Sequence, residues 1–167
     1  MQGKRIKESS ILLAQVMNPQ DANPAGNVHG GVIMKLIDTA AGSAAMKHSR
    51  SNCVTASIDR LDFHNPVFIG DLVTLRAGLN FTGKSSMEVG VRVESQNLLT
   101  GEIRHTVSAY MTFVALDKNG KPIVIPPLIL ETLEEQRRNR EAQARREARL
   151  REKTKEKACQ LSAESCD

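Results

Sequence analysis

The spacing of the apolar residues changes once along this chain, from a helical period to a strand period near residue 50. Between Val32 and His48 there is no proline, and apolar residues recur three and four positions apart, which predicts one long helix. Further on, apolar and polar residues alternate in four stretches separated by turn signals, at 54–58, 73–81, 87–93 and 103–113. Residues 11–17 predict another short strand. Such strands at hairpin spacing indicate an antiparallel sheet with one buried face.

One helix and about five strands must share a single hydrophobic core. The economical packing is a curled sheet wrapped around the helix, which is an α+β architecture. Only 3% of the 167 residues are aromatic, so the core is predicted to be aliphatic. The open sheet edges and a second, small-residue face of the helix predict that two copies pair through edge strands and opposed helices. The residues of that second face are Met34, Ala41, Gly42 and Ala45.

The composition changes after Pro126 and Pro127, which predicts a domain over residues 1–127 and a charged helical extension over residues 128–167. Residues 128–133 are apolar enough to dock on the domain. Residues 134–157 are rich in Glu, Arg, Ala, Gln and Lys, which favours a solvated helix. Nucleic-acid binding by this segment is an alternative, but it lacks aromatic residues and glutamates interrupt its basic positions.

Charge and cysteine content exclude several classes of protein. The formal net charge of +4 suits a small anionic ligand and is far from the basic stripe of a nucleic-acid-binding protein. Cys53, Cys159 and Cys166 have no paired spacing, which predicts reduced thiols and a cytoplasmic location. No apolar run is long enough to insert in a membrane. The histidines and carboxylates lack metal-ligand spacing, so no metal site is expected.

A literal match to the phosphate-loop pattern GxxxxGK[ST] occurs at residues 78–85. A phosphate loop must leave a buried strand and open a helix, whereas the alternation here continues on both sides. We therefore interpret the segment as a hairpin turn. Lys84, Ser85 and Ser86 lie at this bend, where an ammonium group and hydroxyl groups could still hold a phosphate. No GxSxG motif indicates a serine hydrolase.

The most chemically suggestive residues surround the start of the predicted helix. Gly30 and Gly31 immediately precede it, where free N–H groups and the positive end of the helix dipole can bind an oxyanion. Asp38 follows Gly31 by about two helical turns and so lies on nearly the same side. The alternative is structural: the glycines end a loop, Asn23 makes a turn, and Asp38 is solvated.

These residues resemble the hotdog-fold acyl-CoA thioesterases, especially the cytosolic long-chain acyl-CoA hydrolases. The most specific stretch is DANPAGNVHGGVIMKLID at residues 21–38. Similarity extends over roughly residues 11–150. It includes residues 54–57, 63–67, 82–89, 97–101 and 125–127.

The resemblance implies a site at a dimer interface, where Asp38 of one subunit faces Asn23 of the other. It also implies homo-oligomers, either dimers or hexamers built as trimers of dimers, and no cofactor apart from the CoA of the substrate. The residues expected to contact CoA or the acyl group are Lys84, Ser85, Ser86, His29 and Gly30.

The resulting hypothesis is an enzyme that hydrolyses fatty acyl-CoA to free fatty acid and CoA. The leaving thiol has a pKa near ~8.5, so it departs as thiolate without a strong general acid. Asp38 would be the general base or the nucleophile, and Asn23 the group that orients the carbonyl or a water. The oxyanion donor would be the N–H group of Gly31, alone or together with that of Gly30. The alternative is a non-hydrolytic module that binds or senses acyl-CoA on the same fold.

Overall fold

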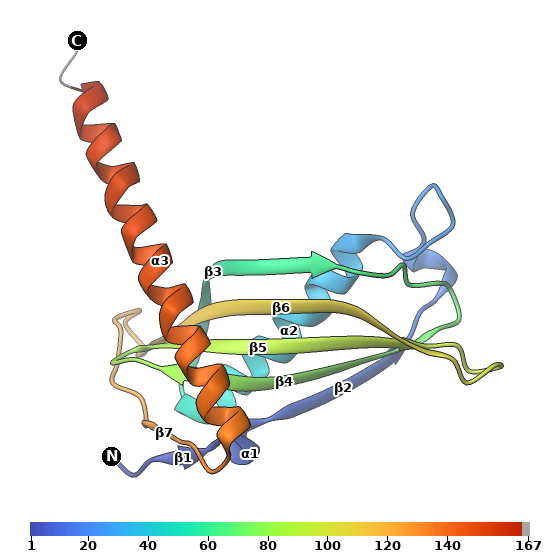
Figure 1. Ribbon diagram of the computed structural model, residues 1–167, viewed down its shortest axis with the longest axis horizontal. Helices are drawn as coiled ribbons and strands as arrows, with labels where there is room; N and C mark the ends of the chain where they lie inside the picture. Colours follow the sequence, from blue (N-terminus) through green and yellow to red (C-terminus); the bar gives the residue numbers. More distant parts are fainter. Residues whose placement is uncertain (165–167) are drawn as a thin grey trace.

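The computed structural model describes residues 1–164, in which a five-stranded antiparallel sheet curls around one long helix (Figure 1). The strand order in the sheet is β2-β4-β5-β6-β3. The predicted fold class is confirmed, and each of the five predicted strands is present. Their bounds are β2 (Ile11–Val16), β3 (Asn52–Phe63), β4 (Leu72–Thr82), β5 (Ser86–Gln96) and β6 (Ile103–Leu116).

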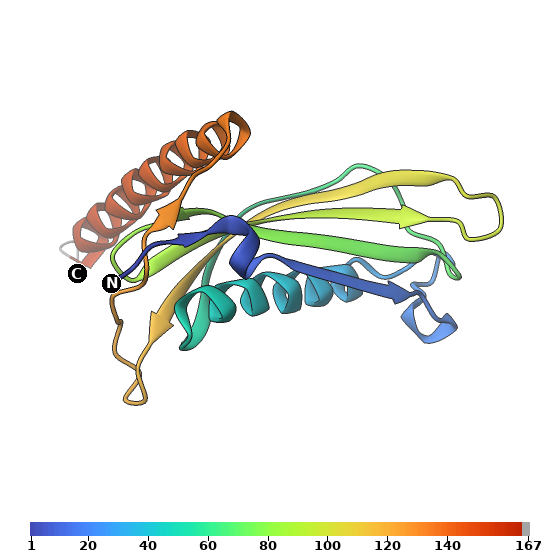
Figure 2. The ribbon, with the colours of Figure 1, turned by 90° about the horizontal axis from the view of Figure 1, so that it is seen from below.

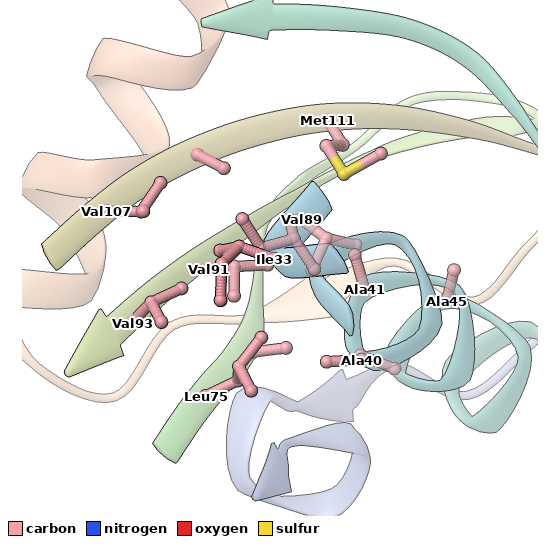
Figure 3. Packing of buried hydrophobic residues seen from close by; sticks show 14 of the residues in the cluster. Ile33, Ala40, Ala41, Ala45, Leu75, Val89, Val91, Val93, Val107 and Met111 are labelled. Carbon is pink, nitrogen blue, oxygen red and sulfur yellow. The ribbon is translucent and has the colours of Figure 1, made fainter. Parts of the chain in front are cut away.

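The helix α2 (Gly30–Ser49) lies along the concave face of the sheet (Figure 2). Its apolar stripe enters a core of aliphatic side chains from the strands (Figure 3). Each alternating strand contributes every second residue to this face, as the period of two requires. Fully buried members include Ile33, Ile37, Leu75, Leu79, Val89, Val93 and Met111.

The small residues of α2 face the subunit's own sheet, which corrects the prediction that they form a separate face for a second copy. Ala41 and Ala45 are fully buried. A Cβ atom added to Gly42 would lie 3.5 Å from Cε1 of Phe113 on β6. The curled sheet covers a wider stripe of the helix than a flat one would, so it also buries these positions. Met34 remains exposed.

Strand β3 departs from the prediction of one buried face. It forms one edge of the sheet, and its outer edge has no partner strand within residues 1–164. The side chains of Val54 and Ile58 are 42% and 46% exposed. Ile58 lies opposite Met111 in the register, so it is on the side of the sheet that carries the core. Val54 lies opposite Val114, which is outside the core, and the register shifts between Thr55 and Ser57, so the exposed apolar residues of β3 do not share one face.

Short elements that the sequence did not predict join the two ends of the domain. Strand β1 pairs with β7 in parallel. The buried His48 at the end of α2 donates from Nε2 to the carbonyl oxygen of Pro126, and its Nδ1 atom hydrogen-bonds the hydroxyl group of Ser9 of α1. Cys53 is a free thiol, whereas Cys166 and the side chain of Cys159 lie outside the described part. These short elements are β1 (Lys4–Arg5), α1 (Ile6–Ser9), the 3₁₀ turn η1 (Pro19–Asp21) and β7 (Leu128–Ile129).

The C-terminal helix α3 (Leu133–Glu164) crosses the convex face of the sheet (Figures 1 and 2), so the prediction of a solvated helix is wrong for its first half. Ala142 is fully buried. Arg145 pairs with Glu88 of β5 at 2.7 Å, and its guanidinium lies 3.8 Å from the ring centre of Tyr110. Docking depends on arginine pairs instead of an apolar stripe, so hydrophobic periodicity did not reveal it. The division at residue 127 stays a prediction.

No helix within residues 1–164 is apolar over a length that could span a bilayer.

Candidate active site

The loop before α2 is held in shape by the side chain of Asn23. Its Oδ1 atom accepts hydrogen bonds from the backbone N–H groups of Ala25 (2.9 Å) and Asn27 (3.1 Å). Gly26, between them, has a φ of +86°, a conformation that glycine adopts without strain. Because the oxygen is used inside the loop, the side-chain NH₂ group of Asn23 is the part left to donate to a substrate.

Helix α2 begins at Gly30, two residues earlier than predicted, with His29 as its N-cap. The N–H group of Gly31 donates to Nδ1 of His29 at 2.9 Å. The N–H group of Gly31, the predicted oxyanion donor, is therefore already used in a hydrogen bond to the N-cap residue His29. The N–H group of Gly30 makes no hydrogen bond to any described residue, so it is the readier donor.

Asp38 lies on the exposed side of α2, next to the start of β3. Its Oδ1 atom accepts a hydrogen bond of 2.7 Å from the hydroxyl group of Thr55. Sequence reasoning missed Thr55, because a threonine in an alternating strand carries no distinctive signal. Only its place within the family-like stretch 54–57 drew attention to that segment.

A cleft of about 380 Å³ opens where the Asn23 loop, the start of α2 and the segment after β3 meet. The ring of Phe63 covers the helix start, since a Cβ atom on Gly30 would lie 3.6 Å from its Cζ atom. Asp38 does not line this cleft, so one chain brings Asn23 and Gly30 together but not Asp38. The lining residues are Asn23, Asn27, Val28, Gly30, Ile33, Phe63, His64, Asn65, Pro66 and Val67.

The Lys84 turn is the β4–β5 hairpin, which confirms the rejection of a phosphate loop. The N–H group of Gly83 donates to the carbonyl oxygen of Ser86 at 2.7 Å. This hairpin lies at the opposite end of the sheet from the Asn23 loop (Figure 1). A single chain therefore does not bring Lys84, Ser85 and Ser86 to the cleft.

Within the described residues, no group of three or more His, Cys, Asp or Glu side chains is placed to hold a metal ion.

Comparison with known proteins identifies the family of this fold and site. The sequence profile of the thioesterase superfamily matches residues 25–102. A Bacillus subtilis protein named as an acyl-CoA thioester hydrolase is 41% identical over 129 residues, which cover 77% of this chain and 75% of that protein. The chain belongs to the thioesterase superfamily. The rat cytosolic acyl coenzyme A thioester hydrolase is 36% identical over 84% of this chain, but the match spans only 37% of the rat protein.

Solved structures of thioesterases share the whole fold. An apo-hexameric acyl-CoA thioesterase superposes with a TM-score of 0.88 at 40% identity, over 91% of this chain and 97% of that one. The Staphylococcus aureus acyl-CoA hydrolase in complex with butyryl coenzyme A and coenzyme A superposes with a TM-score of 0.85 at 34% identity, over 93% and 94% of the chains. Variants of that hydrolase have also been solved with one aspartate, one asparagine or one threonine replaced by alanine.

Replacing Thr55 with alanine is expected to lower kcat for acyl-CoA hydrolysis about tenfold, because a hydrogen bond to a carboxylate positions that group and contributes on the order of 1.5 kcal/mol. Thr55→Ser keeps the hydroxyl group and is expected to retain most of the rate. A thiol-release assay on both variants tests this expectation. Equal losses in the two variants would point to packing instead of the hydrogen bond.

Proposed function

We propose that this member of the thioesterase superfamily hydrolyses fatty acyl-CoA to free fatty acid and CoA, at a site that two subunits build together. Its thioester hydrolase class follows from the family and from relatives named as acyl-CoA thioester hydrolases. The observation that carries the shared site is the separation of Asp38 from the cleft that Asn23 lines. One chain contains both Asp38 and Asn23, but they lie on different surfaces of the subunit.

The free edge of β3 is the surface on which the two halves could meet. Asp38 and its partner Thr55 lie at the start of β3, and the Asn23 cleft includes Phe63 at the end of the same strand. If two β3 edges pair antiparallel about a two-fold axis near mid-strand, the start of one lies beside the end of the other. Asp38 then faces the partner's Asn23, twice in each dimer. This pairing also covers the exposed Val54 and Ile58.

The variants solved for the Staphylococcus aureus hydrolase support this choice of residues. Along that chain the three replaced residues are an asparagine, an aspartate and a threonine, in the same order as Asn23, Asp38 and Thr55 here. The numbers of positions that separate them are also the same in the two chains. Agreement in both type and spacing is a specific resemblance.

In the proposed reaction Asp38 activates a water or attacks the thioester carbon directly. The NH₂ group of Asn23 orients the carbonyl group, and the N–H group of Gly30 stabilises the developing oxyanion. Gly31 can join it once His29 releases the Gly31 N–H. The tetrahedral intermediate then expels CoA as a thiolate, which needs little acid assistance.

We extend the proposal to CoA binding and assembly. In the antiparallel dimer, the β4–β5 hairpin of one subunit lies at the same end as the Asn23 loop of the other, so Lys84, Ser85 and Ser86 can contact CoA across the interface (Figure 1). His29, at the mouth of the same helix start, is a further substrate contact. The hexameric relatives support a trimer of dimers as the higher assembly.

Hybrid dimers test the shared site. Asp38→Asn and Asn23→Ala subunits are each expected to be nearly inactive. When they are co-refolded in equal amounts, half of the dimers are hybrids with one intact site of two, so about one quarter of wild-type activity should return. Thiol release from acetyl-, octanoyl- and palmitoyl-CoA is the readout. A mixture no more active than its parents would contradict the shared site, and CoA-dependent thermal stabilisation without any thiol release would favour a binding module.

A further inference from the structure

The C-terminal helix continues well past the part of it that docks on the sheet. Its docked part includes Asn139, which donates to the carbonyl oxygen of Asn80 at 2.7 Å, and ends with the ion pair between Arg149 and Asp59 of β3. Figure 1 shows the remainder of α3 extending beyond β3, the edge strand, with no described element beneath it. A long helix that projects over the open edge of a sheet is placed to meet whatever joins that edge.

A groove of about 300 Å³ separates α3 from β3 at this crossing. On the strand side it is formed by Ser57, Ile58 and Asp59, which lie in the middle of β3. That is where the two-fold axis of the proposed dimer passes. The helix side of the groove is formed by Arg145, Ala148, Arg149, Glu152, Lys153 and Glu156.

The charges at this crossing are self-complementary. Glu152, Lys153 and Glu156 are exposed, and none of them forms an ion pair with the part of the chain that the structure describes. A second α3 that runs antiparallel and crosses between Glu152 and Lys153 brings each Lys153 beside the other subunit's Glu152. The same crossing brings each Glu156 beside the other subunit's Arg149. Leu150, 46% exposed, adds apolar surface next to this contact.

We infer that this groove receives the α3 helix of a second copy of the chain, so that two antiparallel α3 helices fasten the dimer on the convex side of its joined sheets. The inference rests on the β3 pairing of the proposed function. It adds a second contact layer, opposite to the α2 side on which Asp38 meets the partner's Asn23. The ion pairs of Arg145 with Glu88 and of Arg149 with Asp59 hold each α3 against the convex face of its own sheet, next to the groove.

Site-directed cross-linking tests the contact in the full-length chain. In a background with Cys53, Cys159 and Cys166 replaced by serine, Lys153→Cys is expected to give a covalent dimer with a short bis-maleimide. Arg140→Cys, on an exposed position of the same helix away from the groove, is the matched control and is expected to give little. Equal yields from both variants, or none from Lys153→Cys in an active protein, would overturn the inference.

Charge reversal gives a second readout. Lys153→Glu is expected to raise the dimer dissociation constant about three- to tenfold, because two symmetric ion pairs become repulsive. The added change Glu152→Lys restores opposite charges and should recover tight association, as measured by analytical ultracentrifugation over a dilution series. If Lys153→Glu leaves association unchanged while hybrids of Asp38→Asn and Asn23→Ala regain activity, the α3 contact is wrong and the proposed function stands.

Discussion

Asp38→Asn is expected to lower kcat/KM for acyl-CoA hydrolysis by about two orders of magnitude or more, without changing the oligomer. The amide is isosteric with the carboxylate and can still accept the hydrogen bond from Thr55. It is neither basic nor nucleophilic at neutral pH. Thiol release at saturating and limiting substrate, with size-exclusion chromatography of the same sample, measures both quantities.

A matched control separates loss of chemistry from a general effect of removing one charge. Asp117→Asn makes the same change in the turn after β6, where the carboxylate accepts backbone hydrogen bonds from Asn119 and Lys121 at 2.8 Å. An asparagine can keep those bonds, so near wild-type activity is expected. Full activity in Asp38→Asn would remove Asp38 from the mechanism and with it the proposed site.

Arg145→Ala is expected to lower the free energy of unfolding by about 2–4 kcal/mol. The substitution leaves the Glu88 carboxylate, only 3% exposed, with Asn80 as its remaining side-chain partner. It also removes the guanidinium that covers the ring of Tyr110. We expect a smaller loss of unfolding free energy than for a fully buried ion pair, because the Arg145 side chain is 23% exposed. Urea unfolding at a fixed protein concentration measures it.

The arginine at position 140 provides the comparison, because it lies on the same helix but on its exposed side. Arg140→Ala is expected to change stability little. The double variant Glu88→Gln with Arg145→Ala should recover part of the loss, since it no longer buries an uncompensated charge. If Arg145→Ala and Arg140→Ala were equally stable, α3 would not be held by the Glu88 pair.

Several features of the fold were predictable because they depend on neighbours close in sequence. The period of two specified β4, β5 and β6, whose inward side chains form the core. The helical spacing specified α2 to within two residues at its start. The candidate residues Asn23 and Asp38 came from the helix start and from the resemblance of residues 21–38 to a known family. The positions of the turns, including the hairpin that mimics a phosphate loop, followed from the same alternation.

Other features depend on residues far apart in sequence, and the patterns did not contain them. The pairs Arg145–Glu88 and Arg149–Asp59 join residues more than fifty positions apart, and each side chain alone looks like ordinary surface charge. The role of Thr55 became visible only in the structure, where its hydroxyl group donates a hydrogen bond to Asp38. The small residues of α2 were assigned to the wrong partner because periodicity reports which positions are apolar but not how far a sheet curls around them.

The sequence alone determined the order of the helices and strands, the aliphatic character of the core and which polar residues and glycines lie near the start of α2, because these follow from local spacing and composition. The tertiary structure decided where these residues lie relative to one another. It placed Asn23 in the cleft, Asp38 outside it, and β3 at an open edge between them. Helix spacing places Asp38 about two turns beyond the start of α2, but only the tertiary structure shows that the start of β3 lies beside Asp38 and that the segment after β3 lies beside Asn23, because strand pairing joins residues far apart in sequence.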